Sequence, residues 1–367
     1  MGLSSGQPVH ARHRDGPGGE HDRGKTPRFG AGRVSAGLIA LFLGAPAAAD
    51  TLRLATFSPA LSRPGPGLLL AALQKGDDPQ ISAVVDLIVA TKPDVLLLTD
   101  FDWDYRAEAL GALQAQLAGQ GCDYPFAFAP QPNTGVETGF DIDGNGRLAE
   151  PRDAQGYGQF TGQHGMALLS KRPMRADQAR DFSTFLWRDL PGSQLPQAQL
   201  PEGAAQVQRL ATTAVWDVPV QAGAGGLHLW AYAATTPVFD GPEDRNGRRN
   251  ADETGFWLRY LNGDLPQQPT APFAILGLAN LDPDRGEGRR EAMRKLLDDP
   301  RLQDPKPTAP DAPSSHPLAT ADFGGAIGPL RLDYILPAAG LRVLGAGTAG
   351  NPQASKHRLV WVDLALP

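Results

Sequence analysis

The chain has 367 residues, of which 41% are hydrophobic and 20% charged, with a formal net charge of −6. This composition supports a large buried core and excludes a chain that is disordered throughout. The negative balance provides no chain-wide attraction for a phosphate backbone, which argues against tight, nonspecific nucleic-acid binding. The 43 glycines and 34 prolines predict a protein rich in loops.

Residues 1–49 are predicted to be a leader that ends in a secretory signal peptide. Residues 10–33 are polar, glycine-rich and mostly basic, and the apolar run 34–49 that follows them ends in alanines. This order predicts cleavage before Asp50 and export to the periplasm or the extracellular space. The alternative is a membrane anchor, but the run is shorter than the ~18 residues that a span needs. Because the leader is long, an alternative is that translation starts at a codon downstream of Met1.

Strand-like and helix-like segments alternate along the mature chain. Short apolar runs rich in β-forming residues predict strands at 53–57, 94–102, 165–170, 226–233, 273–279, 330–336 and 357–366. Apolar residues at helical spacing, followed by a Gly or Pro, predict helices at 79–93 and 107–121. The alternation indicates the α/β class, and successive apolar positions within the runs indicate sheets covered on both faces.

The mature chain, residues 50–367, is predicted to form one domain. It has no internal repeat, no further stretch that could cross a membrane, and no linker that would divide it. We interpret the proline-rich residues 300–318 as a surface excursion, because the strand after them is needed to complete the pattern. Cys122 is the only cysteine, so no internal disulfide can form.

Residues 141–153 contain a candidate calcium loop. Oxygen-bearing side chains occupy alternate positions before a glycine: Asp141, Asp143 and Asn145, then Gly146. This is the first half of a loop that wraps hard oxygen donors around Ca²⁺. Position 12 of such a loop is a bidentate Glu, but here it is Arg152, with Glu150 and Asp153 nearby. The other interpretation is a turn in which the carboxylates bind backbone N–H groups.

Residues 239–253 mix acidic and amide side chains with Arg245, Arg248 and Arg249. Mixed charges at this density favour a network of ion pairs and turns that satisfies itself. The functional alternative is a substrate-facing loop whose arginines bind phosphate.

Two polar residues near the C-terminus are candidates for chemistry. Asp333 lies in an apolar strand, where a carboxylate is costly unless it is paired, hydrogen-bonded or bound to metal. His357 stands at the entry to the last strand, and a lone histidine there is more often structural than catalytic.

In order, these segments resemble the endonuclease/exonuclease/phosphatase superfamily, with its deoxyribonuclease-I-like fold, over nearly all of residues 51–366. The resemblance is closest to a secreted bacterial branch and is carried by four stretches: Asn133–Arg147, Gly162–Met174, Trp216–Val220 and Pro237–Glu253. It implies a four-layer α/β/β/α sandwich, with two mixed sheets face to face, helices outside and a site at one edge of the paired sheets.

The chemistry implied by the resemblance is phosphoester hydrolysis. A divalent cation, Mg²⁺ or Mn²⁺, polarises the phosphate, a carboxylate activates water, and histidines neutralise the developing charge. Four residues match the family's site: Asp100 as a metal ligand in place of Glu, Asp333 as a catalytic and metal-binding carboxylate, Asn280 as the residue that orients the phosphate, and His357 as a catalytic histidine. The phosphoester substrate is not identified by the sequence.

Four other positions depart from the family pattern. Ser58 replaces a metal-proximal Asn, Ala233 replaces a His, and Lys356 replaces an Asp. Leu278, in the stretch GLANLDP, replaces the Asp that activates water. Because such residues act as a unit, one loss is expected to lower the rate by orders of magnitude.

Two hypotheses follow from these substitutions. The first is an exported, metal-dependent phosphoesterase with weak activity, in which Asp100, Asp333 or Asp282 recruits the cation. The second is an exported pseudoenzyme that binds a ligand or a partner without turnover.

Overall fold

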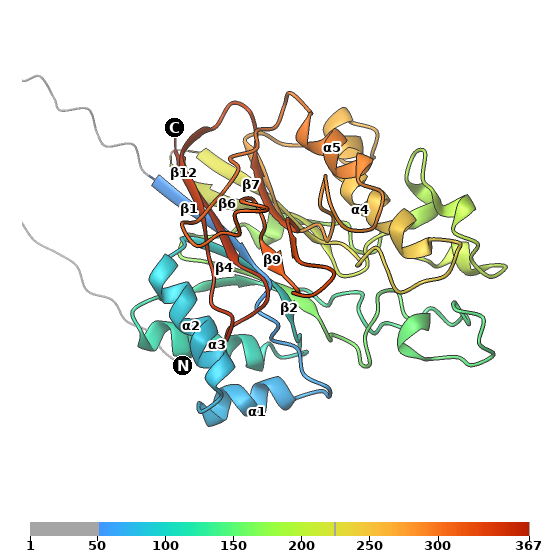
Figure 1. Ribbon diagram of the computed structural model, residues 1–367, viewed down its shortest axis with the longest axis horizontal. Coiled ribbons are helices and arrows are strands. Elements are labelled where there is room, and N and C mark those ends of the chain that lie inside the picture. The colour runs from blue at the N-terminus through green and yellow to red at the C-terminus, as the bar shows by residue number, and fades with distance from the viewer. Residues whose placement is uncertain (1–50, 224, 367) are drawn as a thin grey trace, which may run out of the picture. The chain divides into compact units, whose positions relative to one another are not determined.

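The computed structural model describes residues 51–223 and 225–366 (Figure 1). The predicted leader and signal peptide lie outside these residues. The helices are α1 (Leu68–Lys75), α2 (Pro79–Thr91), α3 (Glu108–Gly119), α4 (Arg245–Asn262) and α5 (Glu291–Leu297). Short 3₁₀ turns are η1 (Pro151–Asp153), η2 (Ala176–Gln178), η3 (Trp187–Asp189), η4 (Leu195–Gln197) and η5 (Ala204–Gln206).

The helices predicted at 79–93 and 107–121 are confirmed by α2 and α3. Helix α2 begins where the Asp78 carboxylate accepts hydrogen bonds from the backbone N–H groups of Gln80 and Ile81. Pro79 fits the first helical position, because its missing N–H would have no partner inside the helix. In the described part of the chain, no helix combines the length and the apolarity needed to cross a membrane.

The first sheet has six strands in the order β12-β13-β1-β2-β4-β3. Its strands are β1 (Thr51–Phe57), β2 (Val95–Phe101), β3 (Phe126–Phe128), β4 (Gly165–Ser170), β12 (Arg342–Ala349) and β13 (Leu359–Ala365). The sheet is mixed, because β1 is parallel to β2 while its other pairs are antiparallel.

The second sheet has five strands in the order β11-β8-β7-β6-β5. Its strands are β5 (Arg180–Asp181), β6 (Val215–Ala222), β7 (Gly225–Ala233), β8 (Phe273–Leu278) and β11 (Asp333–Pro337). This sheet is also mixed, with β7 parallel to β8. A separate hairpin pairs β9 (Ala321–Asp322) with β10 (Pro329–Leu330). Each of the seven predicted strands corresponds to a strand of the two sheets.

Three clusters of buried apolar side chains show how the layers pack. One fills the space between the sheets, a second joins the first sheet to α1, α2 and α3, and a third joins the second sheet to α4 and α5 (Figure 1). The neighbouring residues Leu96 and Leu97 belong to different clusters, as expected for a strand covered on both faces. The predicted four-layer α/β/β/α sandwich is therefore confirmed.

Both sheets contribute to the edge at which the predicted site lies. In the second sheet, Ala233 and Leu278 end the parallel strands β7 and β8, and Asp333 begins β11 opposite Leu278. In the first sheet, His357 precedes β13, whose Val360 pairs with Thr56 near the end of β1. A hydrogen bond between the side chains of His357 and Asp333 joins the two sheets at this edge.

Candidate functional site

Asp333 and His357 form a buried pair at the sheet edge. Asp333 Oδ2 accepts hydrogen bonds from Thr320 Oγ1 at 2.8 Å and from His357 Nδ1 at 2.9 Å. Burial lowers the pKa of His357, but the charges of Asp333 and Asp100 outweigh it, so the pKa lies above its ordinary value. Asp333 Oδ1 is buried and has no hydrogen-bond partner among the described residues. The structure thus brings together two of the predicted catalytic residues.

Asp100 pairs with His164, a histidine that we did not predict as a site residue. Asp100 Oδ1 lies 2.5 Å from His164 Nδ1, and the His164 side chain is 40% exposed. Burial lowers the pKa of His164, but hydrogen bonding to Asp100 and the charges of Asp100 and Asp102 raise it above its ordinary value. The antiparallel pairing of β2 and β4, with Phe101 opposite Gly165, places His164 beside the end of β2. No local pattern in the sequence marks this pair.

Leu278 lies directly beside Asp333, and Ala233 lies on the other side of Leu278; both are positions at which the resemblance predicts a polar residue. Leu278 is opposite Ala233 on one side and Asp333 on the other. Such cross-strand neighbours have Cβ atoms about 4.5–5.5 Å apart in antiparallel pairs. Leu278 is 8% exposed and Ala233 5% exposed, and both belong to the apolar cluster between the sheets. The neighbours of the Asp333 carboxylate on this side are therefore apolar.

The loop after β8 holds its polar residues in internal hydrogen bonds. Asn280 adopts a left-handed backbone with φ 52° and donates from Nδ2 to the carbonyl of Ala234 at 2.9 Å. Asp282 is buried and accepts four hydrogen bonds: from the backbone N–H groups of Asp284, Arg285 and Arg331, and from His316 Nε2 at 2.7 Å. Burial raises the pKa of Asp282, but these donors outweigh it and hold the pKa below its ordinary value. Asp282 therefore stabilises the loop.

Ser58 and Lys356 flank the His357 segment. Ser58 is buried, and its carbonyl accepts a hydrogen bond from Ser355 Oγ at 2.7 Å. Ser355 Oγ in turn accepts from the backbone N–H of His357 at 3.0 Å. Lys356 is exposed, and its Nζ lies 5.7 Å from the ring centroid of Phe323. The Lys356 ammonium thus lies over an aromatic ring at the surface.

Comparison with known proteins identifies the family. A sequence model of the endonuclease/exonuclease/phosphatase family matches residues 72–357. The chain belongs to this family. Among curated proteins, no sequence matches it.

Solved structures of the family share the fold. An endonuclease/exonuclease/phosphatase from Beutenbergia cavernae is 17% identical with a TM-score of 0.54, and the match covers 86% of this chain and 72% of that one. A family protein from Leptotrichia buccalis is 15% identical with a TM-score of 0.51, covering 85% and 98%. Truncated TDP2 from Caenorhabditis elegans is 14% identical with a TM-score of 0.48, and the match covers 86% of this chain and 98% of that one.

Family enzymes are generally dependent on divalent metal ions, which need oxygen or nitrogen donors at the sheet edge. The two carboxylates there, Asp100 and Asp333, are each hydrogen-bonded to a histidine. Within the described residues, only one group of His, Cys, Asp or Glu brings three ligand atoms within 4.8 Å of one another, and it is elsewhere: Asp141, Asp143 and Asp153. At the sheet edge the described residues supply no such group of three, so a cation there would be held by one or two carboxylates and water, as is common for Mg²⁺.

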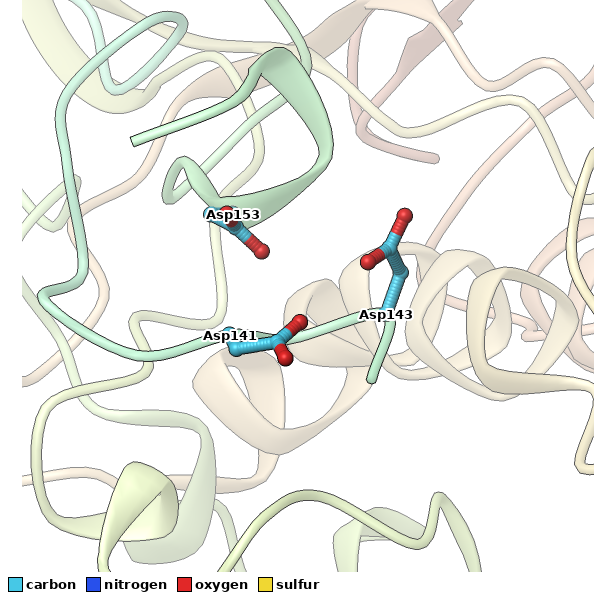
Figure 2. Close-up of side chains that lie close together, drawn as sticks. All are labelled: Asp141, Asp143 and Asp153. Carbon is cyan, nitrogen blue, oxygen red and sulfur yellow. The ribbon is translucent and has the colours of Figure 1, made fainter. Parts of the chain in front are cut away.

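The acidic triad at 141–153 is shown in Figure 2, with its three carboxylates turned toward one another. The third acid is Asp153, which lies one residue after position 12 of the loop and is buried in η1. The Asp141 carboxylate accepts backbone hydrogen bonds from Gly144, Asn145 and Gly146. Asp153 likewise accepts from the backbone N–H groups of Ile142 and Glu150. The loop thus contains both the predicted turn network and a convergent acidic group.

Two charged residues of 239–253 have the structural role that was favoured, but they bind backbone groups of other loops and not a network within the segment. The Arg249 guanidinium donates to the carbonyls of Gln155, Arg209, Leu210 and Ala211. Glu253 accepts from the Thr212 backbone and hydroxyl at 2.6 Å each and from the Thr235 backbone at 2.8 Å. Burial raises the pKa of Glu253 to about 6. Arg249 and Glu253 are therefore structural.

The stretch Trp216–Val220, one of the four that carry the family resemblance, also has a structural role. Asp217 is fully buried and accepts hydrogen bonds from Arg180 Nη1 at 3.0 Å, Tyr260 Oη at 2.8 Å and His228 Nδ1 at 2.6 Å. It joins β5, β6 and β7 to the end of α4. His228 is thus hydrogen-bonded to an aspartate. The same holds for the other histidines within the described residues, which are His164, His316 and His357.

Proposed function

We propose that this member of the family is an exported pseudoenzyme that binds a phosphoester at the sheet edge, with weak or no hydrolysis. The observation that carries the proposal is the strand register that places Leu278 between Ala233 and Asp333. A leucine can neither accept a proton nor bind a cation, so the position that should activate water has no agent. Export is proposed from the leader pattern in residues 1–49.

The nearby carboxylates support the proposal because each already has partners. Asp282 could replace the lost aspartate only if its four donors were released. Asp100 and Asp333 are each held by a histidine. The loss at Leu278 is therefore not compensated by any of these three groups.

The same edge retains groups that favour an anion. His164 and His357 both have raised pKa values, because burial is outweighed by their aspartate partners. Lys356 adds an exposed positive charge one residue before His357. Cationic donors of this kind bind phosphate oxygens through charge-assisted hydrogen bonds.

A second candidate function is slow phosphoester hydrolysis with Mg²⁺ or Mn²⁺. One observation favours it: Asp333 Oδ1 is buried without a hydrogen-bond partner in the described part of the chain, and such an atom is costly. A cation would satisfy that oxygen and would polarise a phosphate.

Hydrolysis of bis(p-nitrophenyl) phosphate and plasmid DNA by the mature chain, in Mg²⁺, Mn²⁺ and Ca²⁺, separates the two functions. The proposal predicts rates at or close to the background without protein, equal in wild type and Asp333→Asn. Asp86→Asn, an exposed change on α2, is the matched control. Metal-dependent turnover that is abolished by Asp333→Asn and kept by Asp86→Asn would show an active enzyme.

The two interpretations of residues 141–153 are separated by melting temperature. A Ca²⁺ ion bound only to the folded protein must stabilise it. A rise with Ca²⁺ that disappears in Asp143→Asn supports a calcium loop, and an unchanged melting temperature supports a turn network that satisfies itself. Asp143 is suited to this test because it is exposed, whereas Asp153 is buried and holds the loop backbone.

A further inference from the structure

A pocket of about 410 Å³ lies in the helical layer that covers the second sheet, between α4, α5 and residues 190–194. The two helices are neighbours in the fold (Figure 1). None of the residues that line the pocket belongs to the candidate site at the sheet edge. Whatever binds here is therefore independent of the proposed function.

Gly255 forms part of the pocket floor, in the interior of α4. Glycine destabilises a helix interior relative to alanine, because its backbone loses more freedom on folding. Packing does not require glycine at this position, since an added Cβ would have no heavy atom within 4 Å apart from the backbone of the helix itself. The missing side chain keeps the pocket open above the helix backbone, which is a reason for glycine that concerns a ligand and not the fold.

Two cations line the pocket and lack a partner for their side chains among the described residues: Arg259 on α4 and Lys295 on α5. The Arg259 guanidinium lies against the turn at Gly192, where an added Cβ would come within 3.2 Å of Nη2. A third cation of the lining, Arg289, is already paired with Asp244 at 2.7 Å. Two positive side chains thus remain available to a ligand.

The acids of the pocket offset this charge only in part. Asp252 is 7% exposed, and its Oδ2 accepts hydrogen bonds from Trp187 Nε1 at 2.6 Å and from the backbone N–H of Gln194 at 2.7 Å. Burial raises the pKa of Asp252, and these donors only partly oppose it. The Arg259 charge also lowers that pKa, but no hydrogen bond joins the two side chains. Glu291 is the exposed acid of the lining, so one free carboxylate faces the two cations.

We propose that this pocket binds a small molecule with two or more oxyanion groups, held by Arg259 and Lys295. A guanidinium forms two parallel hydrogen bonds with a carboxylate or a phosphate, and an ammonium binds either as a point charge. The volume lies in the range of about 300–1,000 Å³ that small-molecule sites occupy. Carboxylate and phosphate present the same oxygens to these donors, so the experiment has to separate the two sources.

Calorimetric titration of the mature chain in metal-free buffer tests the pocket. Citrate is the carboxylate probe, pyrophosphate is the phosphate probe, and trimethyl citrate is the matched neutral probe. We expect at least one anion to bind at least about 10-fold more tightly than the neutral ester. The tighter of the two anions identifies the oxyanion. Affinities equal to that of the ester, or no binding of either anion, overturn the proposal.

Two neighbouring residues of α5 locate the binding. Lys295→Gln is expected to weaken the binding of the tighter anion by about 3- to 10-fold. Arg294→Gln is the matched control, because Arg294 is also exposed on α5 but does not line the pocket. A purely long-range effect of net charge would be the same in both variants. Equal losses in the two, or no loss in Lys295→Gln, overturn the assignment.

Gly255→Ala separates a ligand site from a structural glycine. The added methyl group meets no neighbour, so it should raise the melting temperature by about 1–3 °C. The same methyl group takes up space in the pocket and should weaken anion binding at least about 5-fold. Gly111→Ala in α3, where an added Cβ also has nothing within 4 Å, should give a similar rise with unchanged affinity. A more stable Gly255→Ala variant that binds the anion as tightly as the wild type overturns the placement of the ligand over Gly255.

Discussion

Replacing Leu278 with aspartate would place a second carboxylate beside Asp333, and we expect it to destabilise the fold. Leu278 is 8% exposed, so its replacement loses about 2 kcal/mol of apolar burial. The new carboxylate would stand beside the Asp333 carboxylate, whose partner His357 is already engaged. With the cost of an unpaired buried charge added, we expect the free energy of unfolding to fall by about 3–5 kcal/mol at neutral pH.

The dependence on pH separates the charge from the loss of packing. Burial beside another carboxylate raises the pKa of the new aspartate above its ordinary value, so its charge penalty is absent in acid and appears as the pH rises through that raised pKa. Leu278→Asn is the matched control, because asparagine has nearly the size and polarity of aspartate but carries no charge. Its loss of stability should be nearly independent of pH.

Divalent cations add a second test of the same substitution. A cation bound between the new aspartate and Asp333 would recover about 2.7 kcal/mol at a concentration 100 times its dissociation constant. The wild type and Leu278→Asn should not respond at this site. Guanidinium unfolding followed by tryptophan fluorescence, with and without Mg²⁺ or Mn²⁺, measures both effects. Equal losses for the two variants at every pH, with no response to metal, would refute the argument that Leu278 replaces a site carboxylate.

Three further predictions concern buried polar groups and one glycine. The pKa of Glu253 rises from 4.5 to about 6 on folding, so about 2 kcal/mol of stability is present below pH ~4.5 and is lost as the pH rises through ~6. Glu253→Gln should remove this pH dependence in chemical unfolding, whereas the exposed Glu287→Gln should keep it. Asp217→Ala leaves Arg180, His228 and Tyr260 without their shared acceptor and should lower the free energy of unfolding by about 3–5 kcal/mol, while Asp123→Ala at the surface should change it by less than about 0.5 kcal/mol. Gly277→Ala would place a Cβ 1.9 Å from the carbonyl oxygen of Tyr232 at a φ of 146°, so a melting curve should show a large loss; Gly226→Ala, with 3.6 Å to its nearest atom, is the milder control.

The strands and helices around the site were predictable because they depend on local patterns. The apolar runs that became β7, β8 and β11 have lengths and compositions that determine their type without reference to partners. Their register, which places Leu278 beside Asp333, depends on pairing between distant segments and was not predicted from the sequence.

Contacts between distant segments were not predictable. His164 lies 64 residues from Asp100, and no local pattern marks it as that residue's partner. Two of the partners of Asp282 likewise come from 34 and 49 positions later: His316, which lies within the proline-rich segment, and Arg331, which lies beyond it. The third acid at the calcium-like loop is Asp153 and not residue 152, because the 3₁₀ turn η1 shifts the position that points inward.

The aspartate–histidine pairs give this protein a spectroscopic signature. An imidazole proton held by a carboxylate resonates far downfield of the amide protons when it exchanges slowly with water. His228, His316 and His357 are 12–15% exposed and should give sharp signals of this kind, whereas His164, at 40%, should give a broadened one. Proton NMR could therefore follow both halves of the candidate site separately.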